Sequence, residues 1–439
     1  MSKRAKVFVL CISLALVLFA VIGGLGVKAS TNDGAYRQLG VYSEVLTRIR
    51  GEYVEDPNMS RVTDGALHGL LESLDANSSY LDAAEYRQYK ARKSDGKAGI
   101  GATISKRFGY AAVVSVIPGG PADKAGLDGG DIIEAIEGRS TREMSLAEVN
   151  LIFTGEPGSN VTVSVVRPRR AEPVKAVITR DIVQVPPVTE KVVESGIGYI
   201  RVDALTKGKA QEIASKIKAV QKQGAKKLIL DLRNVADGEP SEGVATANLF
   251  LSHGTITYLQ GQKFPRESFN ADPSKTLTDL PLVVLVNRGT AGPAEIVAAA
   301  ILENARGDVL GDKTFGMGSI QKTIDLPDGA AVILSIAKYY TPGGKAIQDT
   351  AITPNILVAD NTLDDFLGGD EESASGAPLR REKKDGPDEQ LRRAIEVLKN
   401  SEKRADAAAA GAQTAGKPAS SPVKVPNWTP PNQINKPHN

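Results

Sequence analysis

Apolar and polar residues follow four different patterns along the 439-residue chain. Residues 7–27 carry no charge at all. From 36 to 89 apolar positions recur every three or four residues, as in an amphipathic helix. Residues 96–181 hold short β-rich runs bounded by turn residues, whereas 186–358 alternate strand-like with helix-like segments. These changes of pattern predict several domains, with helical, β-rich and α/β character in turn.

The uncharged N-terminal run is long enough to cross a membrane. Its 21 residues at ~1.5 Å each span the ~30 Å hydrocarbon core of a bilayer. Lys3, Arg4 and Lys6 precede the run and favour a cytoplasmic N-terminus. We predict a single-pass anchor over residues 6–27 in the cytoplasmic (inner) membrane, with the bulk of the chain on the periplasmic side. A signal peptide cleaved near residues 27–29 is the alternative, although its apolar region would be shorter.

The remaining pattern predicts individual elements. In the β-rich part, strands are expected at 111–117, 131–137 and 161–167. In the α/β part, strands are expected at 197–205, 226–233, 282–287 and 331–340, and helices at 208–223, 241–252 and 294–305. The strand at 331–340 is expected to close the sheet of the α/β part.

The composition changes after residue 358. Residues 359–386 form a charged linker containing Gly and Ser. An amphipathic helix is predicted over 387–411. The Pro- and Ala-rich residues 412–439 are expected to be disordered.

Charge and residue counts exclude several functions. The 54 basic and 52 acidic residues are spread along the chain without a basic stripe, so nucleic acid is not expected as a partner. The chain has one Cys, Cys11, and three His residues, and their positions predict no disulfide, metal site or His-based triad. The run GDVLGDKT at 307–314 lacks the spacing of a phosphate-binding loop, so nucleotide is not expected either. We predict no cofactor and no metal.

Residues 286–321 contain a strand end, a Gly-containing turn, a helix and a second Gly-rich turn, TFGMGSIQ. Such a strand–turn–helix unit presents a nucleophile or an anion at the helix N-terminus. This stretch resembles the C-terminal processing, or tail-specific, serine proteases, whose motif is N-x-G-S-A-S-A-S-E-I followed by T-F-G-K-G-x-x-Q. Two further segments of the chain, GGPADKAGLDGGDII and TPGGKAIQDTAITPNI, also resemble segments of that family.

The resemblance extends from residue 39 to residue 398. It implies an N-terminal helical part of the protease core over 33–95, a PDZ domain over 96–182 and a crotonase-like α/β core over 183–358. Within the PDZ domain, it implies a helix at 146–153 that lines the peptide groove. The expected fold class is therefore α/β (α+β) and multidomain.

The residues that react in the family are replaced in this chain. Alignment of the two motifs places Gly292 at the Ser nucleophile and Met317 at the Lys base, 25 residues apart as the family requires. The oxyanion positions are Pro293, which has no N–H, and Asp237 with Gly238, where a carboxylate would repel an oxyanion. Gln321, which helps position the Lys in the family, is retained. The resemblance therefore implies a pseudo-protease.

A peptide-binding loop is predicted at the start of the PDZ-like part. Gly99, Ile100, Gly101 and Ala102 match the G-φ-G-φ loop whose backbone N–H groups bind a peptide C-terminal carboxylate, while the peptide adds a strand to the sheet edge. The expected partners are C-terminal peptide segments of other exported proteins. An ordinary turn is the competing interpretation of these four residues.

Two alternatives remain open. The first is an active C-terminal processing serine endopeptidase with a displaced nucleophile, Thr290 or Ser319, and with Lys313 or Lys322 as its base. Neither Lys stands at the family position, and a misplacement of ~1 Å can cost ~100-fold in rate. The second is an architectural envelope protein whose loop at 99–102 is blocked. The sequence also leaves open whether the protein forms a homo-oligomer.

Overall fold

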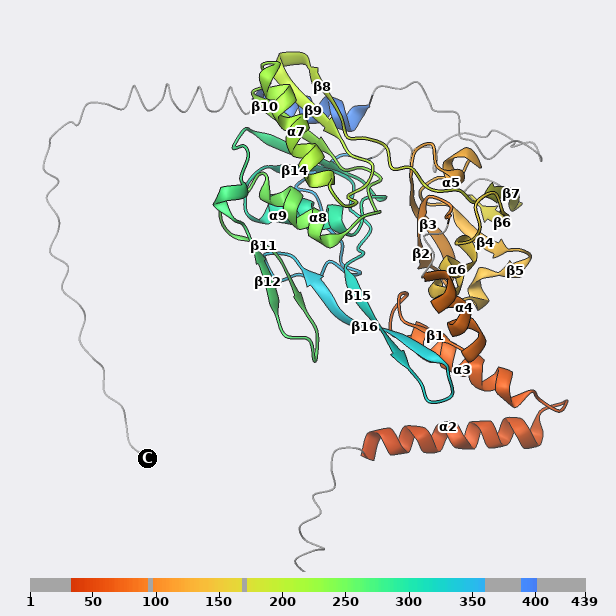
Figure 1. Cartoon of the computed structure of the whole chain (residues 1–439). Coiled ribbons are helices and arrows are strands. Elements are labelled where there is room, and N and C mark those ends of the chain that lie inside the picture. The colour runs from red at the N-terminus through yellow and green to blue at the C-terminus, as the bar shows by residue number, and fades with distance from the viewer. Residues whose placement is uncertain (1–32, 94–97, 168–171, 360–387, 401–439) are drawn as a thin grey trace, which may run out of the picture. The chain divides into compact units, whose positions relative to one another are not determined.

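The computed structural model describes residues 33–93, 98–167, 172–359 and 388–400 (Figure 1). The predicted anchor, linker and C-terminal tail lie outside these ranges, and they stay predictions. None of the described helices is long and apolar enough to cross a membrane. The chain divides into two compact units, residues 1–71 and 72–439. In the first unit, the helical pattern forms α2 (Asp33–Glu52) and most of α3 (Met59–Glu72).

The β-rich part folds into an antiparallel sheet with two short helices. Its strand order is β2-β3-β4-β6-β7, and β5 pairs with β4. The strands are β2 (Ala102–Arg107), β3 (Tyr110–Val116), β4 (Ile132–Ile136), β5 (Arg139–Ser140), β6 (Asn160–Val166) and β7 (Val174–Thr179). The helices are α5 (Pro121–Lys124) and α6 (Leu146–Phe153). Helix α6 begins where predicted because Ser145 caps it, accepting the Glu148 N–H at 3.1 Å.

The α/β part is built on a mostly parallel sheet of order β17-β14-β13-β10-β9-β8. Its strands are β8 (Thr189–Val193), β9 (Ile197–Arg201), β10 (Lys227–Asp231), β13 (Leu282–Val286), β14 (Asp308–Gly311) and β17 (Ile356–Leu357). The helices are α7 (Lys209–Lys222), α8 (Pro240–Asn248) and α9 (Pro293–Glu303). Only β8 runs antiparallel to its neighbour. Strands β10 and β13 are buried along their whole length, because both faces of this sheet are covered.

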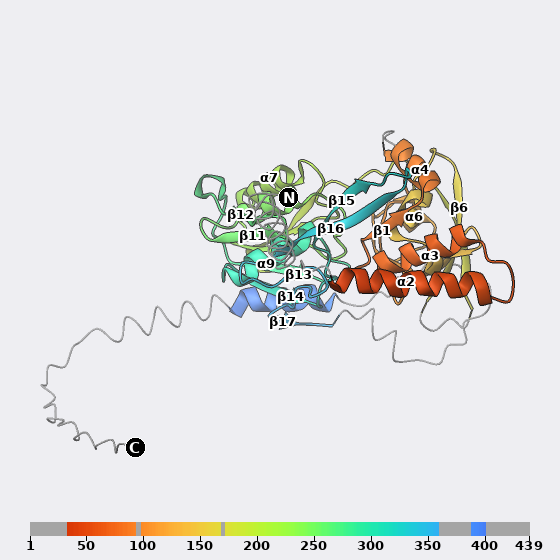
Figure 2. The ribbon, with the colours of Figure 1, turned by 90° about the horizontal axis from the view of Figure 1, so that it is seen from below.

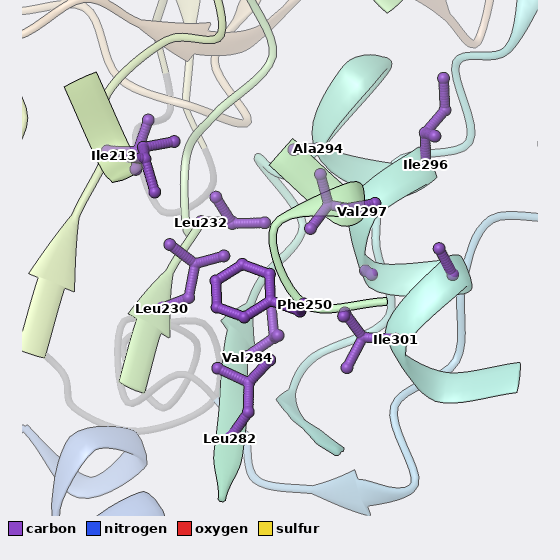
Figure 3. Packing of buried hydrophobic residues seen from close by; sticks show 14 of the residues in the cluster. Ile213, Leu230, Leu232, Phe250, Leu282, Val284, Ala294, Ile296, Val297 and Ile301 are labelled. Carbon is purple, nitrogen blue, oxygen red and sulfur yellow. The ribbon is translucent and has the colours of Figure 1, made fainter. Parts of the chain in front are cut away.

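Alternate residues of the central strands pack into two separate layers. Leu230 and Val284 point to the side of α7, α8 and α9, where they meet Ile213, Phe250 and Val297 (Figure 3). On the other face, their sequence neighbours pack against the helix formed by residues 389–400, which Figure 2 shows beside β14 and β17. The sheet therefore has a helical layer on each side, and its carboxyl edge carries the loops of the site.

The prediction that 331–340 closes the parallel sheet is wrong. Residues Ala331–Tyr340 form β16, the centre of a second, antiparallel sheet with β1 (Ser79–Leu81), β11 (Thr255–Gln260), β12 (Glu267–Asn270) and β15 (Ser319–Asp325). The parallel sheet ends instead on β14 and β17. An amphipathic strand can join either sheet, and only long-range pairing decides. The second sheet includes β1 from the part expected to be purely helical.

The helix at 389–400 is attached at both ends. Asp388 precedes it and accepts the Leu391 N–H at 2.9 Å, as a helix cap does. The same carboxylate accepts two guanidinium N–H groups of Arg233, at 2.9 and 2.8 Å. At the other end, the buried Lys227 ammonium donates to the carbonyl of Leu398 at 2.9 Å. Because Arg233 follows β10, this helix is tied to the loop that leads into the site.

We expect Asp388→Ala to lower the free energy of unfolding by about 1 to 2 kcal/mol, the usual cost of losing an N-cap. Chemical denaturation followed by circular dichroism measures the change. Glu389→Ala is the matched control, because Glu389 is half-buried and, among the described residues, its carboxylate accepts hydrogen bonds only from Arg392 of its own helix. Equal effects of the two substitutions would contradict the role given to Asp388.

Candidate functional site

The turn between β13 and α9 retains the backbone shape expected of a nucleophile position. Gly292 has φ 57° and ψ −119°, a strained conformation that L-residues rarely adopt. A Cβ placed on Gly292 would lie 3.6 Å from the Ala236 carbonyl and 4.0 Å from the Met317 carbonyl. These are ordinary van der Waals distances, so the space for a side chain persists although the residue has none.

The two Gly-rich turns lie side by side, as the sequence predicted, and Glu295 joins them. One carboxylate oxygen of Glu295 accepts the N–H groups of Gly292 at 3.0 Å and Met317 at 2.8 Å. The other accepts the Gly316 N–H at 2.8 Å and the Thr314 hydroxyl. The Glu295 side chain is fully buried. A single carboxyl group therefore holds the position aligned with the family's nucleophile beside the position aligned with the family's base.

Sequence reasoning missed Glu295. Burial raises the pKa of Glu295 to about 7, against the opposing effect of its four hydrogen-bond donors. The signal available in the sequence was an acidic residue at the third position of an otherwise apolar helix. That signal is ambiguous, because a Glu there is also common as a solvent-exposed N-terminal residue.

The N-terminus of α9 has no N–H group to offer an anion. Pro293 lacks one, and Gly292 donates to Glu295. The next N–H groups, of Ala294 and Glu295, donate to the carbonyls of Ala291 at 3.2 Å and Gly292 at 3.0 Å. An oxyanion hole uses such donors, and here each is absent or already engaged.

The backbone at the second predicted oxyanion position, Asp237 with Gly238, is also engaged in hydrogen bonds. Residues on both sides of Gly238 pair with Leu205: the Leu205 N–H donates to the Asp237 carbonyl at 2.8 Å, and the Glu239 N–H donates to the Leu205 carbonyl at 2.9 Å. The Gly238 N–H faces the Asp237 carboxylate. Partial burial of this carboxyl raises the pKa of Asp237, and the Gly238 N–H opposes that shift. The residue as a whole stays exposed.

Met317 lies in an apolar cluster. With Phe315 it packs against the buried residues Val114, Ala236 and Ala291. Val114 belongs to β3, so the cluster joins the β-rich domain to the α/β core. The unbranched, polarizable Met side chain suits such an irregular apolar space, which the stem of a Lys would occupy in the family.

Gln321 does not contact Met317. Its amide donates to the hydroxyls of Ser319 at 2.9 Å and Ser335 at 3.3 Å. It belongs instead to the wall of a pocket of about 340 Å³ beside α6. That pocket is lined by Asn77, Tyr89, Leu146, Ala147, Asn150, Leu151, Thr154, Gln321 and Ile333. The retained Gln is therefore not held at the former base.

Among the described residues, neither alternative nucleophile has a base within hydrogen-bonding distance. The Thr290 side chain is fully buried, and its hydroxyl donates to the Leu232 carbonyl at 2.8 Å. The Ser319 hydroxyl accepts N–H groups of Asn77 at 3.1 Å and Gln321 at 2.9 Å. Lys313 and Lys322 are both exposed, and neither forms a described contact with these hydroxyls. Within the described part of the chain, no group of His, Cys, Asp and Glu is arranged to bind a metal.

The loop at 99–102 has backbone N–H groups without a hydrogen-bond partner among the described residues, in contrast to the N-terminus of α9. Gly99 forms a two-bond bridge with Asp181, at 3.0 and 3.1 Å. Across the described ranges, no hydrogen bond uses the N–H of Ile100 or of Gly101. Gly101 has φ 69°, which favours glycine, and it leads directly into β2 at the edge of its sheet. Helix α6 contacts β2. These are the parts of a groove that takes a peptide as an added strand.

Comparison with known proteins agrees with this architecture. Residues 196–358 match the model of peptidase family S41, and residues 113–167 match a PDZ domain. A carboxy-terminal-processing protease of Bartonella bacilliformis is 30% identical over 84% of this chain and 86% of its own length. The chain belongs to the carboxy-terminal processing proteases of peptidase family S41.

Other members of the family show the same extent of similarity. The carboxy-terminal processing protease CtpA of Bacillus subtilis is 31% identical over 81% of this chain and 78% of its own. A solved photosystem II D1 C-terminal processing protease matches with a TM-score of 0.60 and 27% identity, over 72% of this chain and 92% of its own. The chain thus has both the PDZ domain and the S41 core of a processing protease.

Proposed function

We propose that this S41 protein is a membrane-anchored pseudo-protease that binds the C-termini of exported proteins through its PDZ domain. The observation that carries the proposal is the contrast between two sets of backbone donors. At the N-terminus of α9 every nearby N–H is absent or engaged, whereas the N–H groups of Ile100 and Gly101 have no partner among the described residues. A peptide carboxylate can be accepted by the second set and an oxyanion cannot be accepted by the first.

The side chains support the same conclusion. Gly292 offers no nucleophile, and Met317 offers no base. The fully buried Thr290 hydroxyl cannot approach a substrate without local opening. The proposed membrane anchor rests on the uncharged run at 7–27 and the basic residues before it.

A peptide with a free C-terminus and an apolar last residue should bind with a micromolar Kd, roughly −8 kcal/mol. Amidation of its C-terminus removes the anion that the loop accepts. We expect the affinity to fall by about 1.5–3 kcal/mol, the contribution of a hydrogen bond to a charged group. Fluorescence anisotropy with the acid and amide forms of one labelled peptide measures the difference. Equal affinities would show that residues 99–102 form only a turn.

Two alanine variants test the loop itself. A Cβ on Gly101 would lie 3.3 Å from Pro121 and would require an L-residue at φ 69°. A Cβ on Gly99 meets nothing within 4 Å. We expect Gly101→Ala to weaken peptide binding and Gly99→Ala to leave it nearly unchanged. A larger loss for Gly99→Ala would contradict the proposed geometry.

A further inference from the structure

The hairpin between β2 and β3 has an unusual tip. Phe108 has φ 55°, in the left-handed region that bulky side chains avoid, and Gly109 follows with φ 83°. The Phe108 ring is 87% exposed. A residue that is both strained and exposed contributes little to packing, so a large aromatic side chain at this position calls for another explanation.

Arg107 stands beside this ring at the end of β2. Its guanidinium lies over the Phe315 ring at 5.5 Å, which orients the group while leaving N–H groups at its edge. Within the part of the chain that the structure describes, no carboxylate pairs with Arg107. Lys106 differs in this respect, because it is almost buried and bound to Glu72. Arg107 is therefore the basic residue of β2 that can pair with a carboxylate of a ligand.

The register of an added strand brings a ligand to this point. A peptide whose carboxylate binds at 99–102 runs antiparallel to β2, with its last residue opposite Ala102. Its residue five positions before the last then stands opposite Arg107, since 107 − 102 = 5. Residues opposite each other in an antiparallel pair project from the same face of the sheet. The next residue upstream reaches Phe108.

We propose that Arg107 and Phe108 form an upstream subsite that selects C-terminal peptides with an acidic residue five positions before the last and an apolar residue before it. The inference rests on the proposed peptide-binding function and specifies its ligands. The carboxylate of the peptide pairs with the guanidinium edge, and the apolar side chain covers the exposed Phe108 ring. We expect an acidic side chain in the peptide because the Arg107 guanidinium is a cation that the Phe315 ring already holds in place.

The test uses the full-length protein and two labelled ten-residue peptides, identical except for Glu or Lys five positions before the last. Wild-type protein should bind the Glu peptide about fivefold more tightly than the Lys peptide, an effect of the size of exposed ion pairs. Arg107→Glu should reverse this preference. Lys175→Glu is the matched control, because Lys175 is exposed on β7 at the opposite edge of the sheet, and it should leave the preference unchanged.

Phe108→Gly tests the ring without risk to the fold, because glycine suits the positive φ of the turn. It should weaken binding of peptides with an apolar residue six positions before the last, and should not affect binding of peptides with Ser at that position.

Equal binding of the Glu and Lys peptides, with the acid form still preferred over the amide, would overturn the subsite and leave the proposed function standing. No difference between acid and amide would remove both. Phe108-dependent binding to phosphatidylglycerol vesicles without peptide selectivity would instead assign the tip to a membrane.

Discussion

The purified protein should cleave unfolded protein substrates no faster than background. Removal of a serine nucleophile or its base lowers turnover on the order of 10⁶-fold in enzymes where this has been dissected. Here Gly292 and Met317 lack both groups. The assay is release of labelled fragments from an unfolded substrate over hours, with an active S41 protease as the positive control.

Gly292→Ser with Met317→Lys should not restore activity by itself. The space at Gly292 admits a Cβ, with the closest atom at 3.6 Å, so the Ser fits sterically, at the cost of a strained backbone with φ 57°. The oxyanion donors would still be lacking, because Pro293 has no N–H and the Gly238 N–H faces the Asp237 carboxylate. Loss of one such donor costs about 10²–10³-fold. Adding Pro293→Ala and Asp237→Gly to the double variant should therefore give more turnover than the double variant alone.

Two results would refute the pseudo-protease proposal. One is turnover by the natural protein that disappears in Thr290→Ala or Ser319→Ala. The other is substantial turnover by the Gly292→Ser, Met317→Lys double variant, which would mean that the oxyanion is stabilised by groups other than those identified here.

Glu295→Ala should be the most destabilising single substitution in the core of the site. It leaves four buried donors, those of Gly292, Thr314, Gly316 and Met317, without their acceptor. Each unsatisfied buried polar group costs about 1–3 kcal/mol. We expect a loss on the order of 5 kcal/mol at pH 5.5, or failure to fold. Denaturant unfolding measures it, and Glu303→Ala at the end of the same helix is the control.

The stability of the natural protein should also depend on pH through Glu295. Its pKa is raised to about 7 in the folded state, above the ordinary value of 4.5. The native state therefore binds the proton more tightly than the unfolded state. The resulting stabilisation is fully present below about pH 4.5 and is lost as the pH rises through 7. Across this window the free energy of unfolding should fall by about 3 kcal/mol from this group.

Glu295→Gln separates the charge from the hydrogen bonds. A carboxamide cannot ionise, so the pH dependence of stability between 4.5 and 8 should be smaller in this variant. Its NH₂ group must also face at least one N–H donor, of Gly292, Met317 or Gly316, so the variant should be less stable than the natural protein at pH 5. An identical pH dependence in the two proteins would show that Glu295 does not titrate in this range.

Local pattern by itself determined much of the fold. Periodicity located α7 and α9 and the buried strands β10 and β13, because burial of one face or of both leaves a signature in neighbouring residues. Alignment with the two family motifs placed Gly292 and Met317 at the reacting positions, because each motif is a short turn with its own glycines. The missing Ser, Lys and N–H group were readable from residue identity alone, which needs no tertiary information.

Only the tertiary structure decided how these parts are connected. Strand β16 could have joined either sheet, since its largely apolar run AVILSIAKYY fits both. The roles of Glu295 and Asp388 depend on donors 21 and 155 residues away, such as Gly316 and Arg233, which no local pattern specifies. The same holds for the free N–H groups of Ile100 and Gly101: a donor is free only if no distant carbonyl reaches it. Hydrogen bonding between loops is set by the packing of the whole core, and the sequence contains that packing only implicitly.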